Sequence, residues 1–494
     1  MTNYVKQFIS NSFLLALASF FSLFISYLLR LLLAENLSIS EFGLVYAIIV
    51  LFAFFSIFQH LGLNSALTKY IAEFKVENNF KKIKSAIGMV VIIQLLSSFI
   101  IALMFFLLSD YLAINYFKIA GAALYIKIYS VVLFISPLLI SARSIFQGFQ
   151  NIKYFSLTDF LKMFLVLILT FLFLKQEVGT LSIFIAYFIS VIFTSFLFFI
   201  LAITKVFPKF FIIAFKWDSI LFKKLIYFGL PVLFYSVSGM VFGYIDTILL
   251  TLFRGLEEVA LYNVALPTAN ALASFGLIFT SLLLPLVSEL WAKKDSDRLT
   301  KGINLLYKNL FIILVPISLV FIIFSELILK ILFGVEYIGA SFVFRVLILG
   351  VIFISYSSLN GSILSGIGKP KVYGSITGVM VIFNLVLDLI LIPKYGLNGA
   401  GISTLFSYIL IFIVSSYFLR KYIPFHFKTK DLVLTLINSF IFVGAISFIR
   451  SKLQITLFLE VGISIFSASI LYFGLLFLFK LVSLKDFLTI YKES

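Results

Sequence analysis

Three basic side chains, Arg30, Lys127 and Arg345, lie within apolar runs of the sequence that are long enough to cross a lipid bilayer. A charge near the bilayer centre costs about 2.5 to 3.5 kcal/mol, so these cations need either a partner or a function. One interpretation is that they compensate the charge of a phosphate or pyrophosphate group that has left the headgroup water. The alternative is that each side chain extends along its alkyl stem to the membrane surface, because each lies only a few residues from the end of its run.

Two carboxylates, Asp246 and Asp388, also lie in apolar runs. We expect them to neutralise the two arginines, because charges buried in a protein usually have partners. Coupling to protons or sodium ions is the alternative, since a carboxyl group in an apolar wall can exchange a proton near neutral pH. A further pair, Glu326 and Lys330, is four residues apart on one predicted helix, so these two side chains are expected to pair with each other.

The sequence offers few residues for metal, thiol or cofactor chemistry. It has no cysteine and only two histidines, His60 and His426. Disulfides, thiol catalysis and cysteine metal sites are therefore excluded, and a metal centre built on two imidazoles is not expected. We predict no metal, no cofactor and no catalytic residue.

The elements that must hold these charges are membrane-spanning helices. Hydrophobic residues make up 62% of the 494 residues and charged residues 12%, against about 25% charged residues in a typical soluble protein. This hydrophobic content is enough for roughly fourteen helices of about 20 to 25 residues each, which predicts an all-α, multi-pass membrane protein. The predicted helices cover residues 10–34, 42–66, 84–108, 119–143, 156–174, 181–203, 226–252, 260–288, 305–333, 341–365, 373–393, 399–420, 432–449 and 456–480.

The net charge of +17 is distributed unevenly between the breaks that separate these helices. Most of the Lys and Arg residues fall in every second break or at the termini, and basic breaks face the cytoplasm. We therefore expect a protein of the cell membrane with both termini in the cytoplasm. The positive charge is interpreted as orientation and contact with anionic membrane lipids, and not as nucleic-acid binding. The main basic clusters are Lys69 to Lys84, Lys205 to Lys224, Lys293 to Lys308 and Arg420 to Lys430.

A weak internal repeat relates the two halves of the chain. Lys127 precedes Arg345 by 218 residues (345 − 127 = 218), and the pattern that begins at Ser144 returns at Ser362 with the same offset. Each repeat holds six predicted helices, so the halves should have the same orientation and be related by an axis along the membrane normal. The sequence thus predicts an N-terminal lobe at 1–215, a C-terminal lobe at 216–430 and two additional helices at 431–494. Because Lys127 and Arg345 are repeat equivalents, we expect them to face one shared cavity from opposite lobes.

Several segments of this chain, taken together in their order and spacing, resemble those of polysaccharide or O-antigen type flippases. These flippases belong to the multidrug/oligosaccharidyl-lipid/polysaccharide exporter superfamily, and the resemblance covers nearly the whole chain. No single segment is specific for the family, but the spacing between the segments is. The segments are EFGLVYA (Glu41 to Ala47), LGLNSALTKYIAE (Leu61 to Glu73), IFQGFQNIKYFS (Ile145 to Ser156), GYIDTILL (Gly243 to Leu250) and LIPKYGLNGAGISTLFSY (Leu391 to Tyr408).

The resemblance implies two six-helix lobes in a V shape, with two extra helices, in a monomeric transporter that is not an enzyme. It implies movement of a polyprenyl-pyrophosphate-linked oligosaccharide from the inner to the outer leaflet by alternating access. The first predicted helix carries one arginine, Arg30, where the lipid II flippases of the same superfamily carry several. It carries no acidic residue, where cation-coupled multidrug exporters typically hold one. Both departures favour the polysaccharide branch.

Two other functions stay open at this point. A cation-coupled multidrug or small-molecule exporter on the same fold would need acidic cavity walls, whereas the charges within these helices lean basic. A membrane-embedded polysaccharide polymerase or glycosyltransferase would need a substantial outer loop or a group of carboxylates at the membrane surface. The predicted outer breaks, such as 175–180 and 394–398, leave little room for either.

Overall fold

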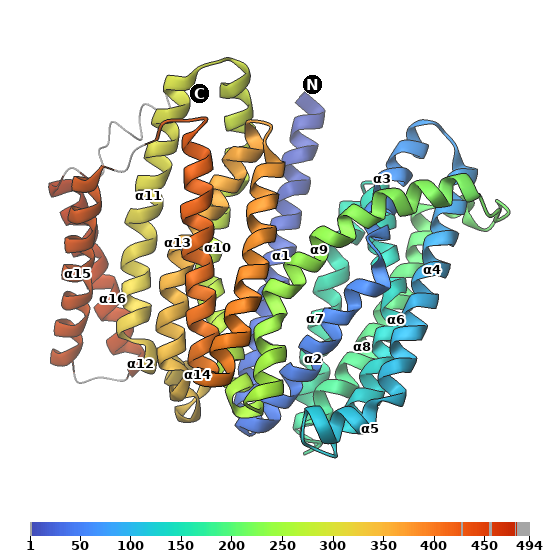
Figure 1. Ribbon diagram of the computed structural model, residues 1–494, viewed down its shortest axis with the longest axis horizontal. Helices are drawn as coiled ribbons and strands as arrows, with labels where there is room; N and C mark the ends of the chain where they lie inside the picture. Colours follow the sequence, from blue (N-terminus) through green and yellow to red (C-terminus); the bar gives the residue numbers. More distant parts are fainter. Residues whose placement is uncertain (1, 426–427, 454–456, 480, 482–494) are drawn as a thin grey trace. The chain divides into compact units, whose positions relative to one another are not determined.

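We describe the protein from a computed structural model, which covers residues 2–425, 428–453, 457–479 and 481 (Figure 1). Within these residues every regular element is a helix. The α-helices of the first half are α1 (Thr2–Asn36), α2 (Ile39–His60), α3 (Leu63–Val76), α4 (Phe80–Leu107), α5 (Ser109–Tyr111), α6 (Ala122–Gly148), α7 (Ile152–Leu174) and α8 (Leu181–Leu201). Those of the second half are α9 (Ser219–Phe253), α10 (Leu256–Ala292), α11 (Ser296–Ile323), α12 (Ser325–Phe333), α13 (Ser341–Gly366), α14 (Pro370–Arg420), α15 (Thr429–Lys452) and α16 (Leu457–Leu478). Short π-helical or 3-10 turns occupy η1 (Leu112–Tyr116), η2 (Ala202–Val206), η3 (Pro208–Phe210) and η4 (Val335–Ala340).

Helix lengths agree with a multi-pass membrane protein. Twelve helical stretches of the described chain are long and apolar enough to cross a membrane. A helix satisfies all of its interior backbone groups within the segment, which is why long apolar runs of this kind form helices in lipid. The all-α prediction is thus confirmed. The count of about fourteen spans stays a prediction, because α10 is not among the twelve and α14 counts as one.

Helix α14 consists of two helical arms joined at Gly396. The backbone there has φ 55° and ψ −133°, a conformation open to glycine and strained for residues with a side chain. Both arms pack on α13, because the Ser357 hydroxyl lies 3.4 Å from the Tyr373 hydroxyl of the first arm and 3.4 Å from the Ser415 hydroxyl of the second. Figure 1 shows the chain of α14 turning back on itself. The predicted break at 394–398 falls at this turn.

The chain divides into two compact units, which we describe separately. The first comprises Met1–Val264, Leu332–Glu336 and Asp388–Leu397, and the second comprises Ala265–Ile331, Tyr337–Leu387 and Asn398–Ser494. Helix α9 packs against α2, α3 and α4 in the first unit, although the repeat places it at the start of the second lobe. The lobe limits at 1–215, 216–430 and 431–494 stay a prediction.

The first unit contains an amphipathic helix that the sequence did not predict. The predicted helix 42–66 ends at His60, and Leu61 and Gly62 then adopt left-handed backbone conformations with φ 48° and 69°. A side chain at Gly62 would place its Cβ 2.0 Å from the carbonyl oxygen of Gly229, so only glycine fits this close approach. Helix α3 follows, and its apolar face packs against α4, α6 and α9. The first basic cluster thus begins on a packed helix and not in an irregular break.

The second unit holds α11, α15 and α16 together through buried polar and apolar contacts. The Tyr472 hydroxyl of α16 donates to the carbonyl oxygen of Ile312 on α11 at 2.7 Å. The Asn438 side chain of α15 donates to the carbonyl oxygen of Tyr472 at 3.2 Å. The rings of Phe442 and Tyr472 are in contact, with centroids 5.3 Å apart and their planes at 52°. These contacts attach the last two helices to α11, and in Figure 1 α15 and α16 (red) lie beside α11 (yellow).

Candidate functional site

Arg30 is half-buried on α1 and has an aromatic neighbour. Its guanidinium carbon lies 4.1 Å from the centre of the Tyr46 ring on α2, within the range of a cation–π contact. One guanidinium nitrogen donates to the backbone carbonyl of Asn263 on α10. A guanidinium has five N–H donors, so these contacts orient the group and leave donors that could bind an anion. The structure therefore places the predicted cation within the protein's first unit.

Asp246 lies in the same polar network as Arg30. It is 4% exposed on α9, and the Tyr262 hydroxyl of α10 donates to its carboxylate. The next residues along both helices are also bonded, because the Asn263 side chain donates to the Thr247 hydroxyl at 3.2 Å. Arg30 and Asp246 thus contact adjacent residues of α10. A direct pairing between them stays a prediction.

A small cavity of about 240 Å³ lies inside the first unit, between α2, α6, α7 and α8. Its walls include the rings of Tyr129 and Tyr187, whose centroids are 5.6 Å apart at 74°. Lys162 and His60 line it as well. Among the described residues, the buried Nδ1 atom of His60 has no hydrogen-bond partner. Aromatic faces next to a cation and an imidazole are suited to a ligand that is both polar and anionic.

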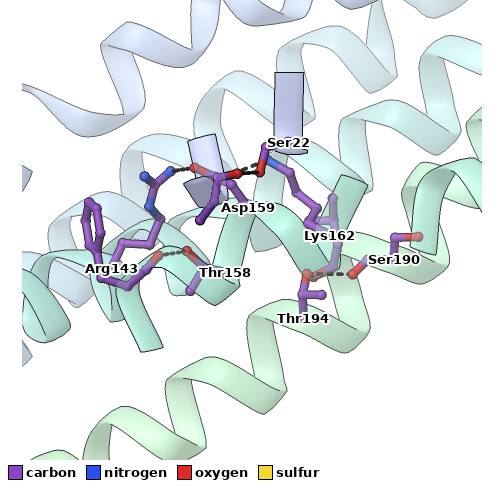
Figure 2. Close-up of polar contacts among 10 residues, drawn as sticks. Ser22, Arg143, Thr158, Asp159, Lys162, Ser190 and Thr194 are labelled. Atoms are coloured by element: carbon purple, nitrogen blue, oxygen red, sulfur yellow. Dashed lines mark hydrogen bonds and ion pairs between the residues drawn. The ribbon is translucent and has the colours of Figure 1, made fainter. Parts of the chain in front are cut away.

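The charge of Lys162 is balanced by a carboxylate shared with a second cation. Asp159 accepts from Arg143 at 2.6 Å and from Lys162 at 3.4 Å, and Figure 2 shows its carboxylate between the two basic side chains. All three side chains are 26 to 34% exposed. The Arg143 guanidinium also lies 4.9 Å from the Phe155 ring centre. The sequence analysis missed Arg143, whose signal was a charge at the edge of an apolar run.

Lys127 and Arg345 occupy equivalent positions in the repeat, and each makes an ion pair with a short helix that precedes its own. The Lys127 amine on α6 lies 3.2 Å from the Asp110 carboxylate on α5. The Arg345 guanidinium on α13 lies 2.8 Å from the Glu326 carboxylate on α12, and its Nε donates to the Ser325 hydroxyl at 2.6 Å. Both cations are more than a third exposed. Asp110 and Glu326 are separated by nearly the same number of residues as Lys127 and Arg345, so the repeat in the sequence also indicated the two carboxylates.

Glu326 was expected to pair with Lys330. In the described part of the chain, its ion pair is instead with Arg345. Glu326 lies in the first turn of α12, where the Arg345 guanidinium of α13 contacts both its carboxylate and the Ser325 hydroxyl, so the pair forms between two helices. That one expectation about helix spacing was wrong.

Asp388, on the first arm of α14, is fully buried. Its expected pairing with Arg345 stays a prediction, as does the shared cavity for Lys127 and Arg345. His426 lies outside the described residues. Among the residues that the structure describes, no group of three or more His, Cys, Asp or Glu side chains could hold a metal ion.

The fold is that of a multi-pass α-helical membrane transporter. It is similar to the lipid II flippase MurJ in an inward closed conformation, with a TM-score of 0.74 and 18% identity over 94% of this chain and 98% of that chain. The family model described as polysaccharide biosynthesis protein matches residues 8–291, and the MatE model matches residues 231–390.

Two curated relatives add detail. An uncharacterized membrane protein of Methanocaldococcus jannaschii, MJ1068, is 30% identical over 91% of this chain and 90% of its own length. The "Probable low-salt glycan biosynthesis flippase Agl15" of Haloferax volcanii is 22% identical over 48% of this chain and 50% of its own length. This chain belongs to the polysaccharide biosynthesis protein family, a flippase family of the multidrug/oligosaccharidyl-lipid/polysaccharide exporter superfamily. The family is one of transporters and not of enzymes.

Proposed function

We propose that this protein moves a polyprenyl-pyrophosphate-linked oligosaccharide from the inner to the outer leaflet by alternating access. The observation that carries the proposal is the combination of aromatic and basic side chains in the first unit of a flippase-family chain. Such a substrate has one strongly anionic part, a polar sugar part and a long apolar tail. The anionic part and the sugar part need different partners inside the protein, whereas the apolar tail can stay in lipid.

The proposed roles of the side chains follow from this chemistry. Arg30 and Arg345 compensate the pyrophosphate, because a guanidinium can donate two parallel hydrogen bonds to phosphate oxygens. Lys127 contributes a third positive charge. The tyrosine rings of the small cavity offer flat apolar faces to the sugars, while hydroxyl and imidazole groups bond the sugar hydroxyls. Asp246 and Asp388 hold the cations in place when no substrate is bound.

The experiment that tests this function uses the full-length chain in proteoliposomes. A labelled polyprenyl-pyrophosphate oligosaccharide is supplied in both leaflets, and an impermeant enzyme or reagent measures the fraction that has become accessible. We expect the rate of exchange between leaflets to rise with the amount of folded protein. Exchange no faster than in protein-free vesicles, under both proton and sodium gradients, would contradict the proposal.

We further propose fourteen membrane crossings with both termini in the cytoplasm. The basis is that α14 is two arms, that α10 is a long continuous helix, and that basic residues gather at alternate breaks. A reporter that is active only in the cytoplasm, fused after Ser494, is expected to be active. A fusion after Gly179, in a predicted outer break, is the matched control and is expected to be inactive. The reverse pattern, in correctly inserted protein, would exclude this orientation.

A second candidate is a cation-coupled exporter of small molecules. The match of the MatE model to residues 231–390 and the burial of Asp246 and Asp388 favour it. The two functions are separated by substrate. Cells that carry an exporter should lose accumulated cationic dyes in an Asp388-dependent way, whereas a flippase should leave dye accumulation unchanged.

A further inference from the structure

A cavity of about 400 Å³ lies in the second unit, between α11 and α15. This volume is within the range of about 300 to 1,000 Å³ that is typical of small-molecule sites. The wall from α11 carries Lys301 and Lys308, and the wall from α15 carries Lys428 and Asp431. The cavity is therefore lined by three lysines and a single aspartate, which gives its lining a surplus of positive charge.

The spacing of these residues makes two facing stripes. Lys301, Asn304, Lys308 and Phe311 are three or four residues apart, so they lie along one face of α11. Helix α15 begins at Thr429, directly after Lys428, and Lys428 makes no side-chain capping bond. The first-turn amides of α15 are thus near the lysines, and such amides favour an anion. The lysine charges and the N-terminal end of α15 therefore both favour the binding of an anion.

One of the three lysines forms an ion pair, which leaves the charge of the other two lysines in the cavity lining uncompensated by Asp431. The Lys308 amine lies 3.3 Å from the Asp431 carboxylate, and both side chains are 23% exposed. The two remaining lysines, Lys301 and Lys428, are exposed at the mouth of the cavity. An anion at this mouth would meet two cations without displacing the pair behind them.

Tyr307, which lines the cavity, belongs to a buried hydrogen-bonded network. The buried Tyr307 hydroxyl donates to the Asn360 side chain, and Asn360 donates to Ser415 at 2.8 Å and Ser416 at 3.0 Å. The Arg420 guanidinium lies 5.2 Å from the centre of the Phe425 ring, which is 5.0 Å from the centre of the Tyr307 ring. Phe311 and Leu432 make the deeper wall apolar.

We propose that this cavity binds the phosphate group of an anionic membrane phospholipid, with Lys301 and Lys428 as its ligands and Phe311 and Leu432 against its acyl chains. A basic pocket between transmembrane helices, open to the headgroup region at one end and apolar at the other, fits a lipid better than a soluble anion. Its lining includes none of the residues that we propose bind the substrate. It joins the two last helices to α11, so an anionic lipid would bridge this contact.

The test uses photoactivatable phosphatidylglycerol with the purified full-length protein in detergent. Cross-linked peptides are mapped, and apparent affinity is measured by competition with unlabelled phosphatidylglycerol. We expect cross-links within 301–311 and 428–435. Lys301→Gln with Lys428→Gln should weaken binding by about 30-fold, the factor expected from two lysines near an anionic lipid. Asp431→Asn should tighten binding several-fold, because it removes the lining carboxylate and releases Lys308.

The matched control is Lys369→Gln with Lys371→Gln, which removes the same charge from the start of α14, outside the cavity lining. This control should bind as the unaltered protein does, and phosphatidylcholine should compete poorly. Equal binding by the cavity variant and the control variant would overturn the proposal. So would displacement of the lipid by inorganic phosphate as effective as displacement by phosphatidylglycerol, since that would assign the site to a soluble anion. The result does not depend on transport, so it stands or falls separately from the flippase assignment.

Discussion

Arg30→Ala and Arg345→Ala are each expected to lower the rate of lipid-linked oligosaccharide translocation by about 10- to 100-fold. The physical reason is the loss of charge-assisted hydrogen bonds to a pyrophosphate that has left water, each worth about 1.5 to 3 kcal/mol. Arg30 has its guanidinium held over Tyr46, and Arg345 has its guanidinium beside Glu326 and Ser325. The measurement is translocation in proteoliposomes, normalised to the amount of folded protein.

Lysine at either position should restore part of the activity. It keeps the positive charge but loses the planar pair of donors that arginine presents to phosphate oxygens. The control is Arg450→Ala, which removes an arginine that is paired at 2.5 Å with Glu460 in the contact between α15 and α16. This control variant should translocate substrate at the unaltered rate once the amount of folded protein is matched.

A structural role for the two arginines makes a different prediction. If Arg345 only balances Glu326, then Arg345→Ala combined with Glu326→Gln should recover full transport, because no unpaired charge would remain. The same reasoning applies to Arg30→Ala combined with Asp246→Asn. We expect both double variants to stay as slow as the single arginine variants. Full recovery in the double variants would refute the substrate role.

Lys162→Gln is expected to reduce translocation by about tenfold or more, because it removes the lysine of the small tyrosine-lined cavity. The fold should be retained, since Asp159 keeps its 2.6 Å ion pair with Arg143. The matched control is Lys153→Gln on the same helix, α7, where the side chain is exposed and outside the cavity. Initial rates at several substrate concentrations would separate weaker binding from slower movement.

The outcome for Lys162 distinguishes a ligand role from a purely structural one. A structural role predicts that Lys162→Gln lowers the thermal unfolding temperature in detergent. A ligand role predicts an unchanged unfolding temperature and a loss of transport in this variant. Equal transport by Lys162→Gln and Lys153→Gln would contradict the assignment of this cavity to the substrate.

Much of the architecture could be predicted because membrane helices are specified locally. The apolar runs predicted long apolar helices, and the described chain contains twelve stretches that are long and apolar enough to cross a membrane. The predicted break at 394–398 includes Gly396, where the two arms of α14 meet. The repeat placed Lys127 and Arg345 in equivalent positions, which both ion pairs agree with. The amphipathic helix α3 was missed because its basic residues were interpreted as a connecting segment, whereas its apolar face packs on α4, α6 and α9.

By itself, the sequence determined the class of the protein, the positions of most helices and the identity of the intramembrane charges. The physical reason is that a backbone in lipid must satisfy its hydrogen bonds within each segment, so apolar length alone specifies a helix. The partners of those charges were decided only by the tertiary structure. Asp159 receives Arg143 from another helix, Tyr262 reaches Asp246, and Glu326 pairs with Arg345 and not with its own helix neighbour. Such pairings depend on how helices are rotated and packed, and that information is spread over all the side chains between them.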